Sequence, residues 1–161
     1  MEITQRTATL GDAALLLTWR NNPSAREFSL HSEQIPLDEH LKWLSDRLER
    51  VQLEPFFIVA VDHKMIGMSR LDIASGPADK YEISILVDPD QHGKGVGTRI
   101  LNMTCESLFS LHPDKTIVAK VHEHNFISQK LFANAGLELR TPEGSFLHFE
   151  KTFKLGQSRF L

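Results

Sequence analysis

The stretch from Val87 to Leu101, VDPDQHGKGVGTRIL, carries three closely spaced glycines between an apolar run and a helix-like pattern. Where a helix begins, unpaired backbone N–H groups converge and the helix dipole favours negative charge. Glycine lets a phosphate approach the backbone and tolerates positive φ. The pattern therefore predicts an anion site. The simpler alternative is a glycine-rich turn that only begins a helix.

Two common phosphate motifs do not fit this stretch. The dinucleotide fingerprint needs a third glycine where this chain has Thr98. The nucleotide P-loop needs Ser or Thr after its lysine, whereas Lys94 is followed by Gly95. The loop therefore favours another phosphate-bearing ligand.

The longer stretch ISILVDPDQHGKGVGTRIL resembles the acyl-CoA-binding motif of the GNAT family of N-acetyltransferases. That motif has Gln or Arg, two residues, Gly, one residue, and then Gly or Ala. His92, Gly95 and Gly97 stand at the three positions, so His92 departs from the usual first residue. The change is tolerable because backbone N–H groups carry most of the function of that loop.

A second stretch, VHEHNFISQKLFANAGLEL, resembles the later motif of the same family. The matching positions are Asn125, Ser128, Phe132 and Gly136. The resemblance covers most of the chain and implies a GNAT fold of mixed α/β class. We expect a central, mostly antiparallel sheet of about seven strands, splayed at the cofactor site and flanked by about four helices. Residues 1–155 would form a single acetyltransferase domain and residues 156–161 a C-terminal tail.

The resemblance also implies that acetyl-CoA is the co-substrate and that no metal takes part. Its pyrophosphate would lie against the loop formed by His92, Gly93, Lys94, Gly95, Val96, Gly97 and Thr98. Asn125, Ser128 and Phe132 would also contact the cofactor. Leu86 and Val87 would bond the pantetheine arm through their backbones. The N–H of Val87 would polarise the thioester carbonyl as an oxyanion site.

Acetyl transfer to an amine requires a neutral amine, a stabilised oxyanion and a thiolate that can leave. Glu82 stands where the family often places a carboxylate acting through water, so we expect it to be the general base; the alternative is a structural or substrate-binding role. Glu123 and His124 are weaker candidates. Many relatives have Tyr where this chain has Phe132. Tyr81 is the one tyrosine in the sequence, and strand neighbours point to opposite faces, so Tyr81 should face away from Glu82.

The residues expected to bind the acceptor lie in the first third of the chain: Arg20, Asn21, Arg26, His40 and Trp43. Arg20 and Arg26 could pair with the phosphates of an acidic substrate. The simpler interpretation places the tryptophan in the core and uses the polar residues to cap a helix. The WRNN…R…H…W pattern resembles the branch that acetylates the 4-amino group of a UDP-linked 4-amino-4,6-dideoxy sugar in pseudaminic acid synthesis. It implies a nucleotide sugar as the acceptor.

Two other functions stay open. A ribosomal-protein N-terminal acetyltransferase has the same fold and a similar W-R-N start, but its cleft should be open to a peptide. A catalytically silent acyl-CoA sensor is compatible with the missing tyrosine. A turnover assay separates the sensor from an enzyme.

Composition narrows the class of protein. The chain has 161 residues, a net charge of −3 and a pI near 6.2, which disfavours a nucleic-acid binder. Its single cysteine, Cys105, cannot form an intrachain disulfide. There is no long apolar run and no secretory pattern, so we expect a cytoplasmic protein without membrane contact. A small-molecule amine is the expected partner, and a homodimer stays open.

Hydrophobic periodicity predicts the elements that position these residues. Helices are expected over 12–22, 37–51, 95–111 and 125–136, with Leu37, Leu41, Leu44 and Leu48 forming the apolar face of the second. Pro23 should end the first helix, and Asn125 and Gly136 should cap the last one. Strands are expected over 2–8, 80–88, 115–121, 137–139 and 145–153, with a hairpin over 55–73 that turns at Asp62 to Lys64.

Overall fold

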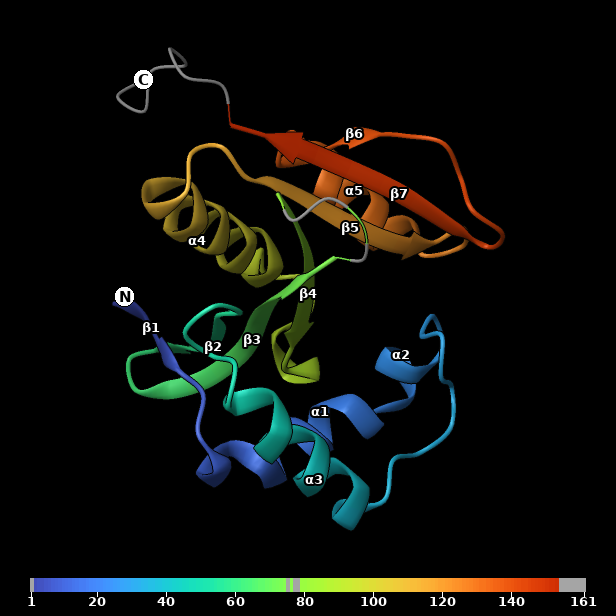
Figure 1. The fold of residues 1–161 in the computed structure, drawn as a ribbon. Coiled ribbons are helices and arrows are strands. Elements are labelled where there is room, and N and C mark those ends of the chain that lie inside the picture. Colours follow the sequence, from blue (N-terminus) through green and yellow to red (C-terminus); the bar gives the residue numbers. More distant parts are fainter. Residues whose placement is uncertain (1, 75, 77–78, 154–161) are drawn as a thin grey trace.

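A seven-stranded sheet forms the centre of the computed structural model, which describes residues 2–74, 76 and 79–153 (Figure 1). Its strands are β1 (Ile3–Thr7), β2 (Phe56–Val61), β3 (Lys64–Ile73), β4 (Lys80–Val87), β5 (Thr116–His122), β6 (Glu138–Leu139) and β7 (Phe146–Thr152). Their spatial order is β1-β2-β3-β4-β5-β7-β6. Only the pair β4–β5 is parallel. The predicted mixed, mostly antiparallel sheet is therefore confirmed. The predicted tail, 156–161, lies outside the described residues.

Helices cover both faces of this sheet (Figure 1). They are α1 (Ala13–Asn21), α2 (Pro23–Arg26), α3 (Leu37–Leu48), α4 (Val96–Leu111) and α5 (Phe126–Asn134). One apolar core joins α1 and α3 to Phe56, Ile58 and Met68. Another joins α4 and α5 to the opposite face, around Ile83 and Ile117. Any side chain of β3 or β4 that faces α1 and α3 is therefore separated from the α4 side by the sheet.

The short helix α2 was not predicted. As predicted, the first helix ends just before Pro23, at Asn21; Pro23 is also the first residue of α2, where its missing N–H costs nothing. Asn22 caps this helix, because its Oδ1 accepts a hydrogen bond from the N–H of Ser24 at 3.0 Å. The consequence is a sharp reversal after α1, which starts the long connection to α3.

The apolar face predicted for α3 is confirmed in part: Leu44 is buried and Leu48 packs against the core, whereas the other two leucines are exposed. Leu37 and Leu41 are 54% and 39% exposed. The buried residues of the helix are His40, Leu44 and Arg47. Nε2 of His40 donates to the carbonyl of Ala13 at 3.0 Å, and Arg47 donates to several backbone carbonyls. Tertiary hydrogen bonds thus allow two polar residues, His40 and Arg47, to lie on the buried face of α3 beside Leu44. A hydrophobic pattern cannot reveal such buried polar residues.

The predicted turn and caps are confirmed. Asp62 and His63 have φ of 47° and 70° and join β2 to β3 in the two-residue turn that suits the twist of a hairpin. Asn125 begins α5, since its Oδ1 accepts from the N–H of Ser128 at 3.2 Å. Gly136 follows the helix with φ of 89°. These features fix β4 and α5 around the cofactor region considered next.

Candidate active site

The parallel strands β4 and β5 separate along their length. They pair only over Lys80–Glu82 and Thr116–Val118. Beyond that point β4 continues to pair with β3, while β5 continues to pair with β7. The predicted splaying of the sheet is therefore confirmed, and it leaves one edge of β4 without a strand partner from Ile83 to Val87.

Backbone alternation decides which groups face this gap. The N–H of Asp88 donates to the carbonyl of Ile66 at 2.9 Å, on the β3 side. Backbone groups alternate sides along a strand, so those of Leu86 also face β3, whereas the N–H groups of Ile85 and Val87 face the gap. Val87 therefore has the orientation that the oxyanion role requires. Leu86 does not have the orientation expected for a backbone contact, and its side chain lines a cavity instead.

The loop before α4 has the backbone that the glycine pattern predicted. Gly93 and Gly95 have φ of 78° and 77°, in the left-handed region that favours glycine. A Cβ built on either one would meet no atom of the described chain within 4 Å. Open space thus lies over both glycines, at the start of a helix of 16 residues. His92 closes one side of the loop, with Nε2 3.2 Å from the carbonyl of Val87.

Gly97 differs from the other two glycines. It lies inside α4, and a Cβ there would stand 3.5 Å from Leu131 and 3.7 Å from Val87. These are ordinary van der Waals distances, so the packing of α4 against α5 and β4 has room for a Cβ at this position. Lys94 and Thr98 are exposed on the loop and the first turn, and Val96 is buried in the core.

The residues expected to contact the cofactor from α5 lie in two different environments. Asn125 and Ser128 lie at the beginning of the helix, joined by the capping hydrogen bond. Phe132 is 7% exposed and packs in the core, with its ring centroid 6.4 Å from that of Phe149. Leu131 is the α5 side chain that approaches the glycine segment. The phenyl ring is thus committed to packing, and a cofactor contact from it stays a prediction.

Glu82 and Tyr81 face as the strand alternation predicted. Tyr81 is buried among core residues, and its hydroxyl donates to the carbonyl of Leu53 at 3.1 Å. Glu82 is on the opposite face, with its side chain 34% exposed and its Oε2 3.7 Å from Nζ of Lys120. Glu82 is therefore accessible to water on the same face of β4 as Ser84. The weaker candidates, Glu123 and His124, are exposed after the end of β5.

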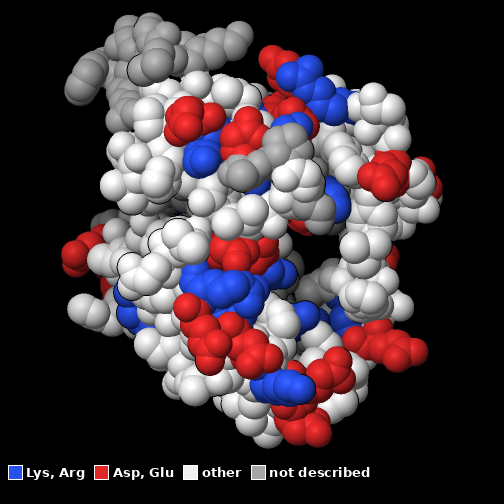
Figure 2. Space-filling view, viewed as in Figure 1, with Lys and Arg blue, Asp and Glu red and all other residues white. Residues whose placement is uncertain are grey.

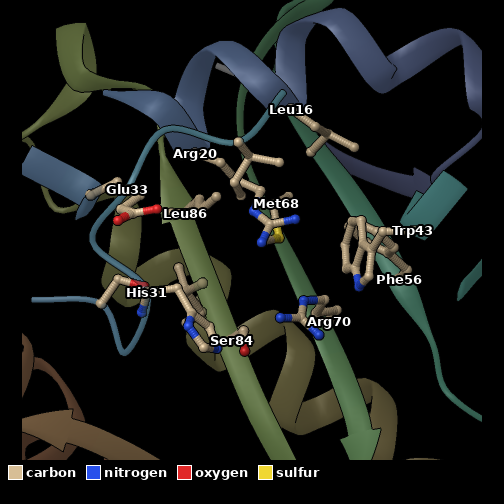
Figure 3. A pocket seen from close by; sticks show the side chains of 14 residues that line it. Leu16, Arg20, His31, Glu33, Trp43, Phe56, Met68, Arg70, Ser84 and Leu86 are labelled. Atoms are coloured by element: carbon tan, nitrogen blue, oxygen red, sulfur yellow. The ribbon is translucent and has the colours of Figure 1, made fainter. Parts of the chain in front are cut away.

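A cavity of about 180 Å³ opens on this same face, between α1, α3, the α2–α3 connection and strands β3 and β4 (Figure 3). Its floor includes Met68, Ser84 and Leu86. His31 and Glu33 of the connection lie along one side, and Trp43 closes the other (Figure 3). The cavity thus lies over one face of β4 at Ser84 to Leu86, and the free edge of this same stretch faces the gap between β4 and β5.

Two arginines in this cavity contact the same indole. The guanidinium carbon of Arg20 is 4.6 Å from the ring centroid of Trp43, and that of Arg70 is 5.3 Å from it. Both distances suit cation–π contact. Burial lowers the pKa of Arg20, and the neighbouring charge of Arg70 adds to that effect. Burial likewise lowers the pKa of Arg70. Figure 2 shows basic side chains gathered at the centre of this view, with acidic ones above and below.

Of the five residues predicted to bind the acceptor, only Arg20 and Trp43 line the cavity. The amide of Asn21 is paired with the backbone of Ile35 in both directions, at 3.0 and 2.8 Å. Arg26 donates to the carbonyls of Asn21 and Ser32. His40 is fully buried. These three residues brace the α2–α3 connection and α1. Arg70, which the sequence analysis missed, lines the cavity in their place.

Groups of the kind that bind a metal are absent from the described ranges: the histidines, cysteine and acidic residues there form no cluster of three. In the sequence HEH, His122 to His124, Nδ1 of His122 accepts a hydrogen bond from the N–H of His124 at 3.1 Å. Within residues 2–74, 76 and 79–153, no helix is both long and apolar enough to cross a membrane.

Comparison with known proteins agrees with this geometry. An uncharacterized protein of Methanocaldococcus jannaschii, MJ1062, is 26% identical over 141 residues, which are 86% of this chain and 28% of that protein. The chain thus spans little more than a quarter of that relative. The structure of yncA from Salmonella typhimurium with its cofactor acetyl-CoA has a TM-score of 0.77 at 18% identity, covering 98% of both chains.

The ribosomal-protein-alanine N-acetyltransferase from Brucella melitensis has a TM-score of 0.76 at 20% identity, covering 92% of this chain and 99% of that one. At these identities the two structures establish the fold. The family is established by the sequence model described as acetyltransferase (GNAT) domain, which matches residues 3–138. Since that match spans most of the chain, the protein belongs to the GNAT acetyltransferase domain family.

Proposed function

We propose that this domain is an N-acetyltransferase that moves the acetyl group of acetyl-CoA to a primary amine. The observation that carries the proposal is the separation of β4 from β5 beside a left-handed glycine loop. The gap offers strand N–H groups to an extended chain, and the open loop offers helix-start N–H groups to a diphosphate. Acetyl-CoA supplies an activated thioester when it is bound.

Two residues of β4, Val87 and Glu82, would take part in the chemistry. The N–H of Val87 would donate to the thioester oxygen, where negative charge develops as the amine attacks. Glu82 would accept the proton of the attacking amine through water, because its side chain is exposed on the cavity face of β4. No tyrosine is available as an acid: the hydroxyl of Tyr81 is bound to Leu53, and Phe132 lies in the core. A thiolate is a fair leaving group, so solvent can protonate it.

For the acceptor we propose the 4-amino group of a UDP-4-amino-4,6-dideoxy sugar. The support is the half-buried guanidinium of Arg20, a cation suited to a phosphate, in a cavity beside β4. The rival acceptor is the N-terminus of a ribosomal protein, the substrate class in the name of the Brucella melitensis structure. The cavity is bounded by the α2–α3 connection on one side and by Trp43 on the other, which favours a small molecule over a peptide. A cytoplasmic location and a homodimer stay predictions.

The experiment is a turnover assay that measures thiol release from acetyl-CoA and, by mass spectrometry, the acetylated amine. The panel would contain a UDP-4-amino sugar, peptides with free N-termini and simple amino sugars. Acetylation of any amine supports the enzyme, and preference for the UDP sugar supports the acceptor. Binding of acetyl-CoA without transfer to any member would favour the sensor and contradict the proposal.

A further inference from the structure

Two arginines beside the cavity, Arg47 and Arg70, have the same carboxylate as their ion-pair partner. Asp72 is shared: its Oδ1 is 2.7 Å from Nε of Arg47, and its Oδ2 accepts from Arg70. Arg47 is 1% exposed, and a charge so buried requires a counterion. One carboxylate is therefore the ion-pair partner of two guanidinium groups, and Glu82 and Glu54 act on Arg70 only at longer range.

Arg20 is the other arginine that lines the cavity with Arg70, and Glu33 lines it as well. In the part of the chain that the structure describes, its guanidinium forms neither a hydrogen bond nor an ion pair, although it lies against Trp43. Its acidic neighbour of note is Glu39, an exposed residue that acts only at longer range. A guanidinium carries five N–H donors. None of the nitrogens of Arg20 is among the fully buried atoms without a partner, so water reaches them, and a ligand with several acceptor oxygens can take the place of that water.

The two guanidinium groups are held near each other. Both lie over the same indole, and their like charges repel, which burial strengthens. Trp43 is itself fixed by packing against His40 and Phe56. In Figure 3 the side chains of Arg20 and Arg70 both extend into the cavity, one from α1 and one from β3. An anion bound between the two guanidinium groups would offset this repulsion, and their planar donors suit the oxygens of a phosphate.

We propose that Arg20 and Arg70, positioned by Trp43, form a binding site for a phosphate group of the acceptor. The inference rests on the proposed function, because it assigns the acceptor side of the same cavity. It narrows the acceptor to amines that carry a phosphate or diphosphate, and it places the phosphate on the β3 side. It also replaces Arg26, whose donors are used by backbone carbonyls, with Arg70.

Binding can be tested without turnover through tryptophan fluorescence. The chain has two tryptophans, and Trp19 is 3% exposed in the core, so a change caused by an anion should come from Trp43. Inorganic phosphate would be titrated at saturating CoA and constant ionic strength, with chloride as the comparison ion. We expect a saturable change for phosphate, lost in Trp43→Phe. A linear response, or an equal one for chloride, would overturn the site.

Arg20→Gln is the informative variant, since no described hydrogen bond of the fold depends on that side chain. Loss of a charge-assisted contact should weaken phosphate binding about tenfold or more. Arg70→Lys keeps the charge but not the planar fork, and its melting temperature shows whether the Asp72 cluster survives. Arg140→Gln is the matched control, because Arg140 is 55% exposed beside Glu138 and Glu150. Equal phosphate affinity in Arg20→Gln and Arg140→Gln would contradict the proposal.

Kinetics separate this inference from the proposed function. Matched amines such as glucosamine and glucosamine 6-phosphate differ only in the phosphate. We expect wild type to have a higher kcat/KM for the phosphorylated amine. In Arg20→Gln the KM for that amine should rise about tenfold or more, so that the preference is lost, while CoA affinity should not change. If wild type acetylates both amines equally well, the proposed phosphate site is contradicted and the proposed acetyltransferase activity is supported. If the protein binds phosphate but transfers acetyl to no amine, the proposed acetyltransferase activity is contradicted and the anion site is supported.

Discussion

Replacing Gly95 with Ala separates the role of this glycine in the fold from its proposed role at a phosphate. Gly95 has φ of 77° immediately before α4. An alanine in the left-handed region costs about 1–2 kcal/mol. A domain of this size loses about 2–4 °C of melting temperature per kcal/mol. We therefore expect Tm to fall by about 2–8 °C from the backbone alone.

The effect on CoA binding should be larger than that strain explains. A Cβ on Gly95 meets no described atom within 4 Å, so it occupies space that the fold leaves open for a ligand. If the added methyl group displaces a phosphate from one backbone N–H, the loss is about 1.5–3 kcal/mol. The Kd for CoA, measured by calorimetry, should then rise about tenfold to a hundredfold.

Gly144→Ala is the matched control. Gly144 also has positive φ, at 59°, and also has no atom within 4 Å of a built Cβ. It lies in the turn between Glu143 and Phe146, outside the glycine loop. This variant should lose a similar Tm and keep CoA affinity. If the two variants bind CoA equally well, the loop is not the diphosphate site.

Further predictions concern single side chains on β4 and on the helices α4 and α5. Glu82→Gln should lower kcat by about 10²–10⁴-fold with CoA affinity preserved, whereas wild-type kcat would rule out the base. Tyr81→Phe loses the hydrogen bond to Leu53 and about 1 kcal/mol of stability, seen in Tm, while kcat should not change; a collapse of kcat would restore a tyrosine acid. Phe132→Tyr should lower Tm without raising kcat, because its hydroxyl would enter the core; a faster variant would contradict that placement. Burial raises the pKa of Cys105 to about 11, so native protein should resist alkylation at pH 8 until unfolded; rapid labelling would show an open core.

Local rules in the sequence anticipated much of the fold. The hairpin at Asp62 and His63, the cap at Asn125 and the glycine loop all depend on backbone conformations that particular residues favour over short distances. Tyr81 and Glu82 followed from alternation along one strand. These features need no knowledge of which elements pack together.

The cavity beside β4 depends on contacts between distant segments, and of the five residues predicted for it only Arg20 and Trp43 line it. Arg70 lies in a strand pattern with no motif around it, and only the packing of α1 and α3 on β3 brings it to Trp43. Arg26 seemed suited to phosphate, but its donors are used by the α2–α3 connection. His40 belongs to the buried face of α3 through a hydrogen bond to Ala13, 27 residues away. A hydrophobic pattern contains no signal for such tertiary pairing.

The central claim is that the gap beside β4 and the glycine loop together hold acetyl-CoA. A nitrogen–proton NMR titration of the labelled protein with acetyl-CoA tests it most directly, because each amide reports its own surroundings. We predict saturable shifts for the amides of Ile85, Val87, Gly93 and Gly95, with a smaller shift for Leu86, whose N–H faces β3, and none for Gly144. Shifts confined to other parts of the chain, or equal shifts for Leu86 and Val87, would contradict the account.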